Sequence, residues 1–223
     1  MAASIICVAP LGAQTAGGTV EPETTQSKTD KRLFGVLPNY RTVDASVPFA
    51  SLSRRQKLSI ARHDSFDWPT YVLAAGLTFV TPGGKAASYG SGLAGFANRY
   101  VRTSADQIAG NMLSEGFLPV VLGEDPRYFR PGTGATWSRL RSALAQIAVA
   151  HDDKGHHTLN LSEFLGNGIA VGISSAYSPN LNSWSHRSEK LALMLSTDTF
   201  SNVLKEFGPD LRERFFHRHH KSS

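Results

Sequence analysis

Apolar residues recur every three to four positions along most of the chain after residue 50, the spacing of one face of an α-helix. Residues typical of helix starts precede three of these stretches: Ser51 or Ser53, Asp67, and Asn160 with Glu163 three positions on. The pattern predicts helices over six approximate ranges, 51–66, 67–80, 91–113, 136–149, 160–177 and 183–207.

Two of these helices carry apolar faces that we expect to pack inward, because an amphipathic helix normally turns its apolar side to the core. The face of the 91–113 helix consists of Ala97, Val101, Ala105, Ile108 and Met112. The face of the 136–149 helix consists of Trp137, Leu140, Leu144 and Ile147 or Ala148.

Glycine and proline separate the predicted helices, and Gly208-Pro209 is expected to end the last one. The segment 31–50 has no helical period and is expected to lie extended across the helices through Leu33, Phe34, Leu37 and Tyr40. The sequence therefore predicts a mainly α fold with minor strand content. It is a single helical bundle of about five or six helices, with Gly/Pro-rich connectors and an extended N-terminal segment.

The stretch FLGNGIAVGISSAY, residues 164–177, contains small residues at regular intervals. Two rows of small residues four positions apart run along it: Gly166, Ala170 and Ser174, and Gly168, Gly172 and Ala176. Such rows let neighbouring backbones approach closely, in lipid or in a soluble bundle. The run is shorter than the roughly 20 apolar residues of a membrane span, and so is 68–80. We therefore expect a buried central helix rather than a membrane-embedded hairpin, with association at a membrane surface as the intermediate case.

The N-terminal residues 1–16 resemble a secretory signal, with a short apolar run followed by small residues near Gly12 and Ala13. They contain Cys7, the single cysteine, and lack basic residues before the apolar run. Residues 17–30 read as a flexible leader, 31–211 as the helical domain and 212–223 as a basic, His-rich tail. An exported protein without disulfides is typical of a bacterial periplasm or envelope membrane.

A net charge of +5 and a pI near 9.5 favour weak attraction to anionic surfaces. Nucleic acid is not expected as a partner, since only the net charge points to it. No cofactor is predicted: the chain has no phosphate loop and no paired C-x-x-C, and no strand precedes the GSGLAG of residues 90–95. The expected partners are membrane lipid or another envelope protein.

The segment EDPRYFR places Glu124 and Asp125 beside Arg127 and Arg130. Paired carboxylates serve metal binding or acid–base catalysis, and the arginines are candidate binding residues. The simpler interpretation is that Asp125 caps a turn begun by Pro126 and that the arginines pair with the acids.

The segment HDDKGHH contains residue types that bind zinc, and the weak metal candidates are Asp153, His156 and His157. Their spacing fits no standard zinc pattern, and Asp-Lys-Gly is a common turn. We therefore expect a solvated loop or a short hairpin here, and no metal site.

Polar residues also interrupt the apolar helices, notably Asp106, Asn167, Asp198 and Asn202. If buried, they need partners, and Arg99 or Arg102 are the expected partners of the acids. They form either a polar cleft, with Asp106 and Asp198 as catalytic candidates and Asn167 and Asn202 as binding candidates, or a satisfied network between helices. The network is the favoured interpretation.

Four stretches together resemble exported proteins of Acidobacteria and related soil bacteria. They are KRLFGVLPNYRTV (31–43), EDPRYFR (124–130), GNGIAVGISSAYSP (166–179) and NVLKEFGPDL (202–211), so the resemblance covers residues 31–211. That family has no assigned activity, so the resemblance implies an envelope setting and no catalytic residue. We predict an exported envelope protein that binds or scaffolds through its Gly-rich bundle and associates with a membrane. The alternative is a metal-dependent or acid–base hydrolase acting through Glu124 and Asp125.

Overall fold

The computed structural model describes residues 32–33, 37–38, 41–80, 89–178 and 180–216. The signal-like segment, the leader, Phe34, Tyr40 and the histidines of the tail lie outside these ranges. The helices are α1 (Arg54–Phe66), α2 (Trp68–Val80), α3 (Gly92–Asn111), the π-helix η2 (Met112–Phe117), α4 (Leu118–Leu122), α5 (Thr136–Ala145), α6 (Leu161–Ser175) and α7 (Trp184–Phe216). The predicted mainly α fold is confirmed.

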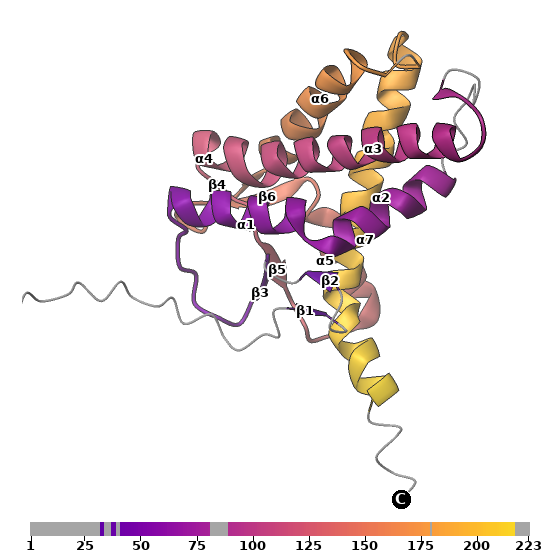
Figure 1. Ribbon diagram of the computed structural model, residues 1–223. Helices are drawn as coiled ribbons and strands as arrows, with labels where there is room; N and C mark the ends of the chain where they lie inside the picture. The colour runs from indigo at the N-terminus through magenta and orange to yellow at the C-terminus, as the bar shows by residue number, and fades with distance from the viewer. Residues whose placement is uncertain (1–31, 34–36, 39–40, 81–88, 179, 217–223) are drawn as a thin grey trace, which may run out of the picture.

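The long helix α7 runs the length of the molecule, and the other helices are arranged along it (Figure 1). Helices α1, α2 and α3 lie in front of it in this view, with α1 against η2 and α2 against α3. Helix α6 packs on η2, α3 and α7, and α5 packs on the lower part of α7.

The strands are short. β1 (Arg32–Leu33) pairs with β2 (Leu37–Pro38), and β3 (Thr42–Asp44) runs parallel to β5 (Tyr128–Arg130). β6 (Val149–Asp152) and β7 (His157–Leu159) form a short hairpin, one of the two structures expected here, and β4 (Glu124–Asp125) pairs with β6. The β3–β5 pair fastens the N-terminal segment to the connector before α5.

The helix starts agree with the sequence signals. Ser53 and Gln56 form a reciprocal capping box at α1. The Asp67 carboxylate accepts from the backbone N–H of Trp68 at the start of α2, and the Asn160 side chain accepts from the N–H of Glu163 in α6.

The third predicted helix does not end near residue 113. It continues through η2 into α4, and Pro119 lies in the first turn of α4, directly after the π-helical residues. The wider π-turn carries Ser114, Glu115 and Gly116 to the buried side. π-Helical turns of this kind occur frequently at functional sites.

The last helix was also predicted to stop too early. α7 continues through Pro209 to Phe216. Arg130 and Arg139 donate to the Glu206 carbonyl just before the proline and pair with the Asp210 carboxylate just after it. These arginines thus bind the helix backbone before the proline and a helix side chain after it, around a residue that normally ends a helix.

One of the two predicted rows of small residues makes the expected close contact. A Cβ on Gly166 would lie 2.6 Å from both Cα and N of Ser114 in η2, and Ala170 and Ser174 of the same row are buried. The second row was wrong as a packing surface, because a Cβ on Gly168 or Gly172 would meet nothing within 4 Å.

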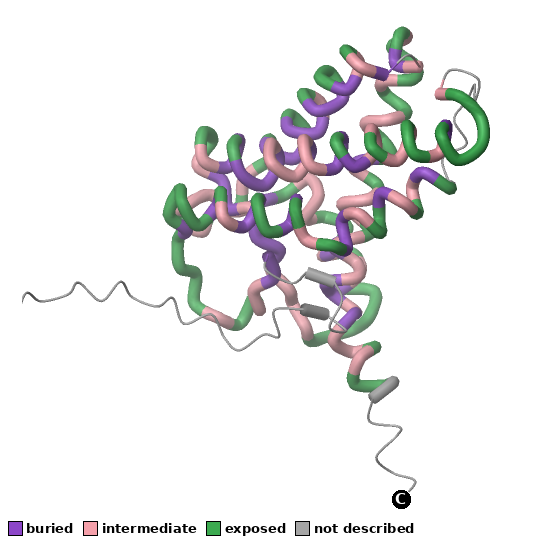
Figure 2. Tube along the Cα trace, in the orientation of Figure 1, coloured by how far each residue is buried: buried purple, intermediate pink, exposed green. Residues whose placement is uncertain are grey.

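The predicted inward faces of α3 and α5 were wrong as well, since both are turned the other way. Val101 in α3, and Trp137 and Leu144 in α5, are exposed, whereas the buried side of these helices carries polar residues such as Asp106 and Arg139. α6 has the same inversion, with buried and exposed residues on opposite sides (Figure 2). Polar groups paired with one another occupy the interior, so the larger apolar side chains are left outside.

Candidate functional site

Five charged side chains from four separate segments meet in the interior of the molecule. Arg41 comes from the residue before β3, Asp64 from α1, Glu115 from η2, and Asp198 and Lys205 from α7. The guanidinium of Arg41 donates to Glu115 Oε1 in a buried ion pair. Burial of this many charges is costly unless they are paired or bind something.

These five residues line a pocket of about 150 Å³ between α1, α2, α3, η2 and α7. We call it the α2–α7 pocket. Its apolar wall is formed by Pro69, Leu73, Phe200 and Leu204, and Leu73 and Phe200 are themselves exposed at the surface. The pocket therefore combines a charged floor with an apolar rim.

Part of the hydrogen-bonding capacity of the floor is unused. Among the described residues, no hydrogen-bond partner is present for the buried atoms Arg41 Nε, Asp64 Oδ1 and Glu115 Oε2. Lys205 is 7% exposed, and no hydrogen bond or ion pair joins it to another residue in the described part of the chain. An unsatisfied buried polar group costs about 1–3 kcal/mol, so a site of this kind favours a bound partner.

Burial shifts the protonation of these groups. It raises the pKa of Glu115 to about 8, although Arg41 acts in the opposite direction. Burial also lowers the pKa of Lys205. The pKa of Glu163, on α6 behind the pocket, lies well above its usual value because of burial and the nearby Asp198.

A smaller cavity of about 30 Å³ gathers several residues that the sequence singled out. Glu124, Asp125, Arg127, Asp198 and Asn202 all line it. The volume holds about one water molecule and no substrate.

Both acids of the EDPRYFR segment have structural partners. The two oxygens of Glu124 accept from the N–H groups of Leu161 and Ser162, at 3.3 and 3.0 Å, and so cap the start of α6. Asp125 accepts from the backbone N–H of Arg127 and forms an ion pair with its guanidinium at 2.5 Å. Asp125 therefore caps the turn and pairs with Arg127, as the simpler interpretation of the sequence expected.

Arg130 does not join them. It reaches Asp44 at 3.7 Å and Asp210 at 2.9 Å, beside Arg139. Arg139 also pairs at 2.5 Å with Glu206, whose side chain is fully buried.

The expected partners of Asp106 were wrong. Its carboxylate accepts from the Tyr177 hydroxyl and the Lys190 ammonium rather than from Arg99 or Arg102. Burial and the bond to Asp106 raise the pKa of Tyr177 to about 12. The amide of Asn167 donates to Glu163 at 2.9 Å and to Asp198 at 3.2 Å, so the expected network between helices is present at Asn167.

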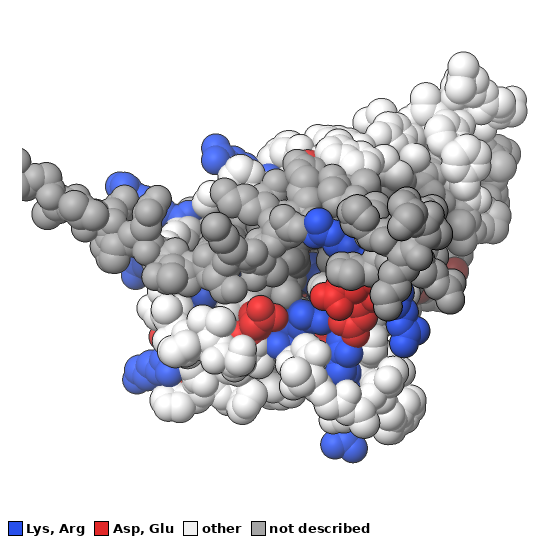
Figure 3. Space-filling view, turned by 90° about the horizontal axis from the view of Figure 1, so that it is seen from below, with Lys and Arg blue, Asp and Glu red and all other residues white. Residues whose placement is uncertain are grey.

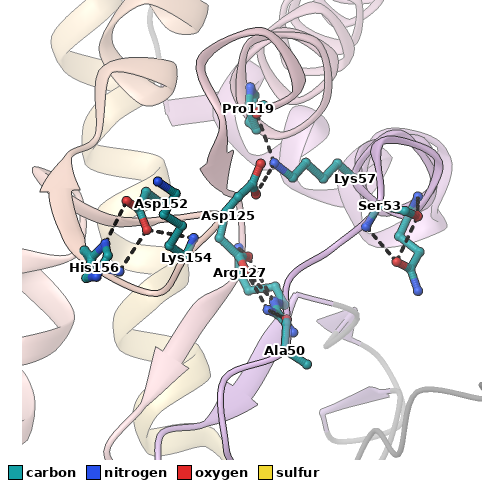
Figure 4. A network of polar contacts seen from close by, with 11 residues as sticks. Ala50, Ser53, Lys57, Pro119, Asp125, Arg127, Asp152, Lys154 and His156 are labelled. Carbon is teal, nitrogen blue, oxygen red and sulfur yellow. Dashed lines mark hydrogen bonds and ion pairs between the residues drawn. The ribbon is translucent and has the colours of Figure 1, made fainter.

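The residues named as weak metal candidates have other contacts. Asp153 pairs with the buried ammonium of Lys57 at 2.5 Å. Figure 4 shows the same ammonium donating to the Pro119 carbonyl. His156 contacts Asp152, and the ring of His157 lies against that of His151. Within the described ranges, no group of three His, Cys, Asp or Glu side chains is placed to hold a metal ion.

Sequence reasoning found Asp198 but missed Arg41, Asp64, Glu115 and Lys205 as pocket residues. Glu115 did carry a signal, because it is a lone acid in the apolar stretch NMLSEGFLPVV. Asp64 and Lys205 stand among other polar residues, and the sequence gives no reason to single them out.

No protein-family model, no curated protein and no solved structure matches this chain.

Proposed function

We propose that this chain is an envelope protein that associates with a membrane without spanning it and acts by binding or scaffolding. The outward face of α6 carries this proposal. Leu161, Phe164, Leu165, Ile169 and Ile173 lie along it and are each 43–48% exposed, while Glu163 and Asn167 point inward. Contiguous apolar surface of this kind marks an interaction site with a protein or a membrane.

Helix α2 repeats the arrangement. Trp68, Val72, Leu73 and Phe79 are exposed, whereas Thr70, Ala74 and Thr78 are buried. Two separate helices thus expose apolar side chains and bury polar ones. This favours contact of both with one apolar environment, such as a membrane, over contact of one helix with one protein partner.

The hydroxyl groups of α7 are consistent with such a surrounding. Ser196, Thr197 and Thr199 donate to the carbonyls four residues earlier, at 2.6–2.9 Å, so their polar atoms are satisfied without water. Serine and threonine in membrane helices commonly bond in this way.

The lengths of the helices set the mode of contact. α2 has 13 residues and α6 has 15, about 20 and 22 Å at the rise of an α-helix. In the described part of the chain, no helix is long and apolar enough to cross a bilayer. We infer that α2 and α6 lie in the interface, and the net charge of +5 adds attraction to anionic lipid. On the face seen in Figure 3, acidic side chains lie among basic ones near the middle, and the upper right part is largely uncharged.

Flotation with vesicles of phosphatidylcholine and phosphatidylglycerol tests the proposal. The protein is expected to float with the vesicles. The double variant Phe164→Ser/Ile169→Ser is expected to bind them at least about tenfold more weakly. The matched control is Leu144→Ser/Leu211→Ser, which removes two similarly exposed apolar side chains from α5 and α7. Equal losses in the two variants would overturn the assignment of the face. Failure to float together with a discrete dimer in solution would show that a second copy covers it.

The alternative hydrolase gains no support at its predicted centre. Glu124 is engaged by two backbone amides and Asp125 by Arg127. Neither carboxylate is left free for a substrate, so we do not propose chemistry there.

A further inference from the structure

We propose that the α2–α7 pocket binds a small zwitterion, a group with an ammonium and an anionic phosphate a few atoms apart. The phosphoethanolamine headgroup of a phospholipid is the form we infer. The assignment of a lipid source rests on the proposed membrane association, whereas the chemistry of the pocket floor is independent of it.

The floor of the pocket contains both a hydrogen-bond donor and hydrogen-bond acceptors that have no partner in the described chain. Among the described residues, Arg41 Nε is a buried donor without a partner, and Asp64 Oδ1 and Glu115 Oε2 are buried acceptors without partners. The buried ammonium-bearing side chain of Lys205 lines the same pocket. All four side chains are more than nine-tenths buried. One ligand that offers both an anion and N–H donors satisfies both kinds of group at once.

The charges that line the pocket are of both signs. Three acids, Asp64, Glu115 and Asp198, and two bases, Arg41 and Lys205, line the pocket. A simple anion would face the acids and a simple cation would face the bases. Burial raises the pKa of Glu115 and lowers that of Lys205, so it disfavours an uncompensated charge of either sign in the floor. A ligand without net excess of either sign is therefore favoured.

The volume of the pocket and its apolar rim also fit a phospholipid headgroup. A volume of about 150 Å³ is that of a cavity that accepts benzene, so it suits a group of roughly six to eight non-hydrogen atoms. Phosphoethanolamine is of this size. The rim residues Leu73 and Phe200 are 41% and 59% exposed, and Leu73 belongs to the outward face of α2. Acyl chains attached to a bound headgroup would leave the pocket along this apolar rim.

The same geometry predicts selectivity among headgroups. The ammonium of ethanolamine has N–H groups to donate to Asp64 and Glu115, whereas the methylated nitrogen of choline has none. A phosphatidylcholine headgroup would leave both acceptors unsatisfied, so the pocket should prefer phosphatidylethanolamine.

The experiment compares vesicles of phosphatidylethanolamine with phosphatidylglycerol against vesicles of phosphatidylcholine with the same share of phosphatidylglycerol. The wild-type chain is expected to bind the first on the order of tenfold more tightly. Lys205→Met and Asp64→Asn should each abolish this preference while keeping the binding to phosphatidylcholine vesicles, and a cooperative urea transition shows that the variants are folded. Lys154→Met removes the same charge from an exposed site on the β6–β7 hairpin and should keep the preference.

The outcomes separate the two proposals. Binding to both kinds of vesicle with equal affinity would overturn the headgroup site and leave the membrane association standing. Absence of binding to either would overturn the membrane association. In that case, a titration of soluble phosphoethanolamine decides the pocket. Saturable binding that Lys205→Met removes would establish a site for a free zwitterion, and no binding would refute the site altogether.

Discussion

Gly166 of α6 lies so close to Ser114 of η2 that a Cβ on the glycine would stand 2.6 Å from the serine backbone. This contact brings two helices together at the positions where each turns an acid inward. Glu163 precedes Gly166 by about one turn, and Glu115 follows Ser114 directly. The close approach of the two backbones thus helps to assemble the charged interior.

Gly166→Ala is expected to destabilise the fold by about 1–3 kcal/mol, because the new methyl group meets backbone atoms that cannot rotate away. Gly172→Ala on the same helix is the control. Its Cβ would meet nothing within 4 Å, and alanine favours the helix by up to about 1 kcal/mol. Urea denaturation measures both variants, and equal stability of the two would contradict the contact.

The stability of the protein should fall as the pH rises, in part because of Glu115. Burial raises its pKa from 4.5 in the unfolded chain to about 8 in the fold. Between pH 4.5 and about pH 8, Glu115 therefore keeps its proton in the folded state and has lost it in the unfolded state. The stabilisation from this proton is fully present below about pH 4.5 and is lost as the pH rises to about 8. Glu115→Gln should reduce the decline between pH 5 and 8 by on the order of 1 kcal/mol per pH unit. Glu189→Gln, at an exposed position of α7, should leave the decline unchanged in urea denaturation across this range.

Arg139→Met should destabilise the protein by about 3–5 kcal/mol. It leaves the fully buried Glu206 without its guanidinium partner, and removal of one member of a buried ion pair is more costly than loss of the whole pair. Arg141→Met, two residues along α5 and exposed, should change the stability by less than about 0.5 kcal/mol. The thermal midpoint of each variant decides the matter. A small effect of Arg139→Met would mean that Tyr128 and Gly132, the other donors to Glu206, hold the carboxylate without it.

Lys57→Met should cost about 1–3 kcal/mol, since the Pro119 carbonyl loses its donor while the packing of the side chain is largely kept. Asp153 lies partly exposed and regains water when its partner is removed. Arg54→Met, at the exposed start of α1, is the control for charge. Chemical denaturation that ranks Arg54→Met as the more harmful variant would show that the Lys57 contacts do not join α1 to α4.

Much of the fold was predictable because its signals are local. The caps at Ser53, Asp67 and Asn160 depend on a side chain and a backbone N–H no more than three residues apart, so each could be found in the sequence. Helix ends were less predictable where distant groups replaced local bonds. Arg130 and Arg139 lie 76 and 67 residues from Glu206, yet both bind α7 beside Pro209, where the helix continues.

The candidate site was predictable only in fragments. Asp198 stood out as an acid on an apolar helix, and Glu115 carried a similar signal that was missed. Arg41 and Lys205 lie 164 positions apart and face the same pocket because β3 pairs with β5 and α7 packs against β5. No local pattern contains that relationship.

The sequence by itself determined where helices form, where most of them begin and that α6 carries rows of small residues that permit close approach, because propensity, capping and residue size act over a few positions. Only the tertiary structure decided which side of each helix is buried. Periodicity divides a helix into an apolar and a polar face without saying which one turns inward. In this protein the ion pairs and hydrogen bonds among buried charges turn the polar faces inward and leave the apolar ones on the surface.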